Sequence, residues 1–145
     1  MTRFATSIFC DDVRHEVNGK VSFMGVYQGA MFCASFPAQL IKLCVSISVT
    51  TPIDEPFESV IFKGSFEGET IFEMPLTKEQ IEEALAQAVR QADAKFRSIQ
   101  VMMIVAPMLF SKPGNLKIEV TADGEPVRCP GLLVLQAPGD MQLVG

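Results

Sequence analysis

Apolar and polar residues alternate along much of this chain, which predicts a protein built mainly of β-strands. In the segment 41–50, every second residue is apolar and branched: Ile41, Leu43, Val45, Ile47 and Val49. Successive side chains of a strand point to opposite faces, so these five are expected to face the core. The outward face would then carry Lys42, Cys44, Ser46, Ser48 and Thr50. Thr51-Pro52 predicts the end of this strand, because proline cannot continue the hydrogen-bond ladder.

A hairpin is predicted at residues 9–27, F-C-D-D-V-R-H-E-V-N-G-K-V-S-F-M-G-V-Y, with its turn at Asn18-Gly19. A two-residue turn needs positive φ at both positions, which Asn-Gly tolerates well. We expect strands at 4–10 and 21–27 on either side of it. A strict two-residue loop would pair His15 with Ser22 and leave neither face cleanly apolar. A bulge or a wider loop is therefore expected near residues 11–16.

Turn dipeptides at short intervals predict the remaining strands. Glu67-Gly68 and Asp123-Gly124 each predict a hairpin turn, and the run at 98–106 is apolar on both faces, as in a central strand. The further strands that we expect are 58–66, 69–74, 98–106, 116–121, 127–129 and 132–136.

One amphipathic helix is predicted at about 78–97. Thr77 and Gln80 form a capping box, and Leu76 with Ile81 forms a hydrophobic staple across the helix start. An apolar stripe then recurs every three or four residues: Ile81, Leu85, Ala88, Ala92 and Phe96. One helix among many strands favours a single domain over 1–145, mainly β, an antiparallel β-sandwich with the helix as a connection. A small β-barrel with one helix is the alternative.

Composition limits the classes of function. Hydrophobic residues make up 48% of the 145 residues, charged residues 20%, and the net charge is −5. A negative surface repels phosphate, so nucleic acid is not an expected partner. No segment approaches the roughly 20 apolar residues that cross a bilayer, and Asp11-Asp12 interrupts the N-terminal apolar run. We therefore expect a cytoplasmic protein without a membrane partner.

The four cysteines give no metal motif. Cys10, Cys33, Cys44 and Cys129 are scattered, without a C-x-x-C pair, so neither structural zinc nor a disulfide framework is indicated. In a reducing compartment they are expected to be buried thiols.

Asp11, Asp12 and His15 form the one cluster of carboxylates and histidine. On a strand, Asp11 and His15 share a face but stand ~13 Å apart, and Asp12 faces the other way. Cys10 and His15 also point to opposite faces, which disfavours a thiol nucleophile activated by this base. We therefore assign no catalytic, cofactor-binding or metal-binding residue and expect no enzyme activity and no cofactor.

Two further apolar features bear on function. Met102, Met103 and Met108 are expected in the core. The segment 139–145 contains Met141, Leu143 and Val144, and either packs on its own domain or adds to the sheet edge of a neighbouring chain.

Three segments carry a resemblance to a known family: residues 9–27, F-P-A-Q-L-I-K-L-C-V at 36–45, and P-G-N-L-K-I-E-V-T-A-D-G at 113–124. In these the chain resembles an uncharacterised family of small bacterial and phage-associated proteins, a domain of unknown function. The resemblance implies an immunoglobulin-like sandwich and supplies no activity or site residue.

These observations favour a non-enzymatic protein-binding or assembly module, phage- or prophage-associated and able to form a homo-oligomer. Two alternatives remain open. One is a metal-dependent enzyme or binder that uses Asp11, Asp12, His15 and Cys10, and the other is a carrier of a small apolar ligand.

Overall fold

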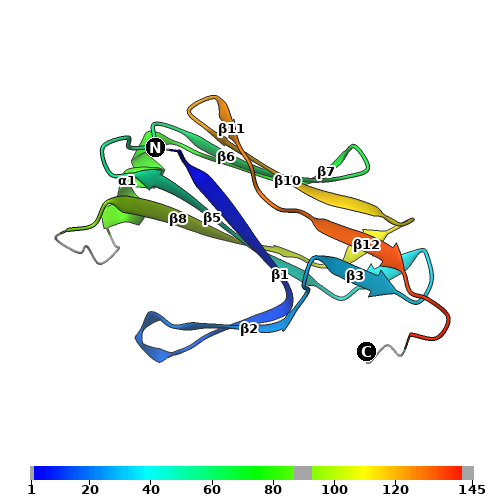
Figure 1. Ribbon diagram of the computed structural model, residues 1–145. Helices are drawn as coiled ribbons and strands as arrows, with labels where there is room; N and C mark the ends of the chain where they lie inside the picture. Colours follow the sequence, from blue (N-terminus) through cyan, green and yellow to red (C-terminus); the bar gives the residue numbers. More distant parts are fainter. Residues whose placement is uncertain (1, 87–92, 142–145) are drawn as a thin grey trace. The chain divides into compact units, whose positions relative to one another are not determined.

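The computed structural model describes residues 2–86 and 93–141, and these are mainly β-strands (Figure 1). Over these residues the strands are accompanied by one α-helix, α1 (Lys78–Ala86), and a 3-10 turn at Val17–Gly19. In chain order the strands are β1 (Phe4–His15), β2 (Val21–Val26), β3 (Ala30–Cys33), β4 (Ala38–Leu40), β5 (Leu43–Pro52), β6 (Val60–Phe66), β7 (Glu69–Leu76), β8 (Phe96–Val105), β9 (Met108–Phe110), β10 (Gly114–Ala122), β11 (Glu125–Val127) and β12 (Leu132–Gln136).

The strands form three sheets. One has the order β2-β1-β5-β8, a second has the order β3-β12-β10-β6-β7 with β11 pairing β10, and β4 pairs β9 in the third. The hairpin pairs β1–β2, β6–β7 and β10–β11 are antiparallel, whereas β3 and β12 run parallel. The predicted class, mainly β in antiparallel sheets with one helix, is confirmed. Both larger sheets have open edges within the described residues, so the barrel alternative does not hold there.

The chain divides into two compact units. The first comprises Met1–Ser7, Ile47–Val101 and Lys117–Pro130, and the second comprises Ile8–Ser46, Met102–Leu116 and Gly131–Gly145. The prediction of one domain over 1–145 stays a prediction.

In the first unit, Arg3 and Asp123 join three distant segments. The Arg3 guanidinium contacts the Asp123 carboxylate at 2.8 Å, and its carbon lies 4.7 Å from the centre of the Phe57 ring. Asp123 also accepts hydrogen bonds from the backbone N–H groups of Glu58 and Ser59, at 2.7 and 2.8 Å. Burial alone would raise the pKa of Asp123. The two N–H groups and Arg3 outweigh burial and hold that pKa below its usual value.

The start of the predicted helix is confirmed and its end is not. The Thr77 N–H donates to Gln80 Oε1 at 2.9 Å, and the Gln80 N–H donates to Thr77 Oγ1 at 3.3 Å, which is the expected capping box. Helix α1 buries Ile81. The predicted stripe residues Ala88 and Ala92 lie outside the described residues. From Phe96 the chain is strand β8, because pairing with β5 extends the strand further back than the helical pattern suggests.

Strand β5 is central in its sheet, which corrects the two-faced pattern predicted for 41–50. It lies between β1 and β8, and nine of its ten residues are buried, on both faces. Cys44 and Ser46, predicted to face outward, are among them. Ile41, predicted to be in the core, precedes the strand and is 90% exposed. The strand ends at Pro52, as the proline predicted.

Strand β8 is at an edge of the same sheet, whereas its apolar run predicted a central strand. Of its side chains only Ile99 is buried, and Ile104 is 62% exposed. Met102 and Met103 are half-buried and Met108 is buried, so the three methionines do not share one environment.

The predicted hairpin turns are present, with positive φ at both residues of Asn18-Gly19, Glu67-Gly68 and Asp123-Gly124. The first loop is wider than two residues: His15 pairs with Val21, and the Glu16 N–H donates to the Lys20 carbonyl at 2.7 Å. A wider loop is thus present, but it lies at residues 16–20, and the irregularity predicted near 11–16 is wrong for β1, which keeps one register from Cys10 to His15.

Candidate functional site

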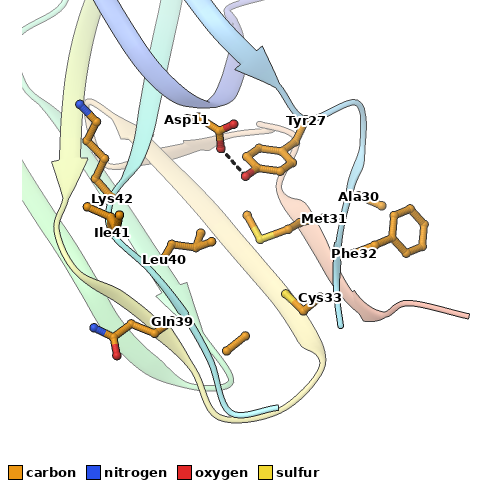
Figure 2. Close-up of a pocket in the computed structure, with 11 residues that line it drawn as sticks. Asp11, Tyr27, Ala30, Met31, Phe32, Cys33, Gln39, Leu40, Ile41 and Lys42 are labelled. Carbon is orange, nitrogen blue, oxygen red and sulfur yellow. Dashed lines mark hydrogen bonds between the residues drawn. The ribbon is translucent and has the colours of Figure 1, made fainter. Parts of the chain in front are cut away.

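The second unit contains an open groove with a volume of about 740 Å³ (Figure 2). One wall is strand β3, residues 30–33, and the other is formed by residues 38–42, which include β4. Asp11 of β1 and Tyr27, which follows β2, also line the groove. Figure 2 shows the side chains of Met31 and Leu40 directed toward each other across the groove, whereas the Phe32 ring points away from it.

Asp11 and Tyr27 are joined by a hydrogen bond in which the tyrosine hydroxyl donates to Asp11 Oδ1 (Figure 2). Partial burial raises the pKa of Tyr27, and the hydrogen bond to Asp11 and its negative charge raise it further. The phenol therefore stays protonated at neutral pH and acts as a donor to Asp11.

Asp12 has a different partner from Asp11. Its Oδ1 lies 2.6 Å from the ammonium nitrogen of Lys42 and 2.9 Å from the backbone nitrogen of Val13. The Lys42 hydrogen bond lowers the pKa of Asp12, and the same bond raises the pKa of Lys42. Lys42 lines the groove, but its ammonium group forms an ion pair with Asp12, which does not line the groove.

The structure does not assemble Asp11, Asp12 and His15 into one centre. Asp11 binds Tyr27, Asp12 binds Lys42, and His15 lies at the exposed end of β1 opposite Val21. Over residues 2–86 and 93–141, no three His, Cys, Asp or Glu side chains are placed to hold a metal ion.

Three buried thiols belong to the same unit. Cys33 lines the groove, while the sulfur atoms of Cys10 and Cys44 lie 3.4 and 3.8 Å from the backbone oxygens of Asp12 and Asp11. Burial raises the pKa of both Cys10 and Cys33, so the reactive thiolate is disfavoured at neutral pH. These three cysteines are buried, as predicted, and Cys129 is half-buried.

The edge strands of the two larger sheets differ in how they are protected. Natural edge strands commonly carry charges or proline, which block pairing with another chain. β7 contains Glu69, Glu73 and Pro75, and β8 contains Arg97. Neither β2 nor β3 contains a charged residue or a proline. Since β3 also forms a groove wall, an unprotected edge borders this site.

Sequence reasoning missed both groove walls, because β3 and β4 have only four and three residues. Strands so short give no readable alternation. The local indications were Gly29, which has a φ of +83° just before β3, and the apolar run Ala30–Cys33 that follows it.

A model of a protein family of unknown function, DUF6941, matches residues 5–134. The chain belongs to this family. The match covers every groove residue and confirms the resemblance to a domain of unknown function; the bacterial and phage association stays a prediction. No curated protein and no solved structure matches the chain of this DUF6941 member. The part of the chain that the structure describes contains no helix long and apolar enough to cross a membrane.

Proposed function

We propose that this protein is a non-enzymatic protein-binding module that accepts an extended segment of a partner as an additional strand beside β3. The observation that carries the proposal is an edge strand without charge or proline that forms one wall of an open groove. Extended peptides bind to exposed sheet edges through main-chain hydrogen bonds, and side-chain pockets add specificity.

The position of β3 supports this function. Its one strand neighbour among the described residues is β12, and no residue of β12 lines the groove. The other edge of β3 has no strand partner among the described residues, and the groove lies on the face of β3 toward which Met31 points (Figure 2). Four residues of extended strand span about 13 Å, so the edge offers room for a short peptide segment.

The chemistry of the groove supports binding more than catalysis. Its carboxylate, Asp11, is engaged by the Tyr27 hydroxyl, and its thiol, Cys33, has a raised pKa. The histidine lies at the end of β1 and does not line the groove. The cytoplasmic location, the immunoglobulin-like form of the sandwich and homo-oligomer formation are further parts of the proposal.

Selection of peptides against a matched pair of variants tests the function. Phe32 on β3 and Leu135 on β12 are register partners, and both side chains are exposed. Phe32→Lys places a charge on the edge strand, whereas Leu135→Lys places the same charge on an interior strand. We expect random heptapeptides displayed on phage to be enriched by the unmodified protein and by Leu135→Lys, and to be lost with Phe32→Lys.

Hydrogen exchange with an enriched peptide then locates the bound segment. The amides of residues 30–33 should gain protection on binding. The function is contradicted if no peptide is enriched, or if the enriched peptides bind Phe32→Lys as well and protect a different strand.

A small apolar ligand is the second candidate, because the groove volume falls within the range of about 300–1,000 Å³ that is usual for such sites. Leu40 and Ile41 supply an apolar contact surface there. A thermal-shift screen with fatty acids tests this candidate: a rise in melting temperature that Leu40→Gln removes would support it, and no rise with any chain length would exclude it.

A further inference from the structure

The groove has one carboxylate without a cationic partner. Asp11 is exposed, and its Oδ1 accepts the Tyr27 hydroxyl. Within the described residues, no lysine or arginine forms an ion pair with Asp11. Its second oxygen, Oδ2, is close to the position that a β-carbon of residue 25 would take, and residue 25 is a glycine. Because Asp11 is exposed and forms no ion pair among the described residues, its carboxylate is accessible to a cationic group of a partner.

The positive charge of the groove is already neutralised. The ammonium group of Lys42 lies 2.6 Å from Asp12, whose carboxylate balances its positive charge. Counted together, Asp11, Asp12 and Lys42 carry a net charge of −1, within a protein whose net charge is −5. Both the groove and the protein as a whole would therefore repel an acidic partner and attract a basic one.

The remainder of the groove offers apolar surface. Leu40 is half-buried and Ile41 is 90% exposed, while Met31, which is buried, faces Leu40 across the groove (Figure 2). Methionine is flexible and adapts to differently shaped side chains. Alternate residues of a strand point the same way, about 6.6 Å apart, so an added strand can direct a basic side chain and apolar side chains into the groove together.

We propose that the groove selects an extended peptide that carries a lysine or arginine at Asp11 and alternate apolar residues between β3 and β4. This inference rests on the proposed binding function and specifies the chemistry of the partner. Asp11 and the hydroxyl of Tyr27 form the recognition pair, in which Tyr27 holds the carboxylate in place and the peptide supplies the cation.

Defined peptides test this preference. The probes are fluorescein-labelled hexapeptides with alternate valine and threonine and one terminal lysine, made with lysine at either end, together with counterparts in which glutamine or glutamate replaces the lysine. In fluorescence anisotropy, we expect the better lysine peptide to bind about three to ten times more tightly than its glutamine counterpart. The glutamate peptide should bind most weakly. The difference should shrink as salt is added, since salt screens exposed charges.

Two variants isolate the role of Asp11. Asp11→Asn keeps an oxygen that can accept the Tyr27 hydroxyl but removes the charge, so lysine and glutamine peptides should bind it equally. Glu69→Gln removes one charge from β7 in the other unit and should leave the lysine preference unchanged. In Asp12→Asn, Lys42 is freed at the groove, and the glutamate peptide should bind more tightly than it binds the unmodified protein.

The outcomes separate the two proposals. If valine-containing peptides bind without a preference for lysine, or if Asp11→Asn retains that preference, the basic specificity is wrong and the binding function stands. If none of the peptides binds and phage selection enriches none, both proposals fail.

Discussion

The carboxylate of Asp11 occupies the space that a β-carbon on Gly25 would fill. Residues 11 and 25 lie between the register pairs Cys10–Val26 and Asp12–Met24 of the first hairpin. Gly25 also has a φ of +69°, a conformation that residues with a β-carbon adopt at a cost. The absence of a side chain at residue 25 thus allows Asp11 to reach Tyr27.

Gly25→Ala is expected to destabilise the protein by about 2–4 kcal/mol, because backbone strain and the crowding of Asp11 both contribute. Gly19→Ala is the matched control: its φ is +74°, and no atom lies within 4 Å of its would-be β-carbon. It should lose only about 1–2 kcal/mol from strain. Urea denaturation of both variants measures the difference, and equal losses would show that Asp11 does not crowd residue 25.

The ionisation of Tyr27 can be followed directly, since the chain contains one tyrosine and no tryptophan. Burial and Asp11 raise the pKa of its phenol, so absorbance at 295 nm should rise only above the ordinary value of about 10. Asp11→Asn should shift the titration to lower pH but not fully to the ordinary value, because burial remains. A titration that Asp11→Asn leaves unchanged would contradict the hydrogen bond.

The same group predicts how stability falls in alkali. A phenol with a raised folded-state pKa contributes stability that is fully present below the unfolded pKa of about 10. This contribution is lost as the pH rises through the folded pKa. We expect the loss between pH 10 and 12 to be smaller in Tyr27→Phe, as measured by urea denaturation at several pH values.

Ile41 and Ile47 provide a test of the corrected strand. The alternating pattern places both on one face, but Ile41 is 90% exposed and Ile47 is fully buried. Ile41→Ala should change the free energy of unfolding by less than about 0.5 kcal/mol. Ile47→Ala should lower it by about 2–5 kcal/mol. Comparable losses of unfolding free energy in the two variants would instead support the prediction that both side chains face the core.

The contrast between Ile41 and Ile47 separates the features that local sequence patterns predict from those that depend on the whole fold. Local patterns correctly located the hairpin turns, the capping box at Thr77 and most strands, because each depends on residues a few positions apart. They did not determine which strand is central. β5 and β8 are each ten residues long, and their burial depends on neighbours from other parts of the chain.

Candidate site residues were predicted only in part for the same reason. The pattern predicts a strand only to residue 10 and an irregular segment near 11–16, whereas β1 continues through Asp11 and Asp12 to His15. Lys42, the partner of Asp12, lies just before β5, so that contact depends on how the hairpin meets another part of the chain. Tyr27, the partner of Asp11, ends the hairpin itself, where its backbone N–H donates to the Phe9 carbonyl. The groove itself required β3 and β4, which are too short to recognise from alternation.

Asp123→Asn tests the contacts of Asp123 with Arg3 and with the backbone N–H groups of Glu58 and Ser59 in the first unit. Because the folded-state pKa of Asp123 is lowered, its contribution to stability is present above the unfolded pKa of about 4 and is lost as the pH falls through the folded pKa. We expect Asp123→Asn to lose about 1–3 kcal/mol at pH 7 and progressively less below pH 4. Asp140→Asn, at an exposed position, serves as the control. A loss that stayed constant down to pH 2 would argue against the charged contacts.

The parallel pairing of β3 with β12 has a consequence for synthesis of the chain. Ala30 pairs with Leu133, and Cys33 pairs with Gln136, so each pair spans roughly a hundred residues. Contacts between such distant residues form slowly, since closing a long loop costs entropy before the contact is made. During translation, β3 must wait for β12 to leave the ribosome. Until then, an uncharged apolar segment lacks its neighbour and is open to a chaperone.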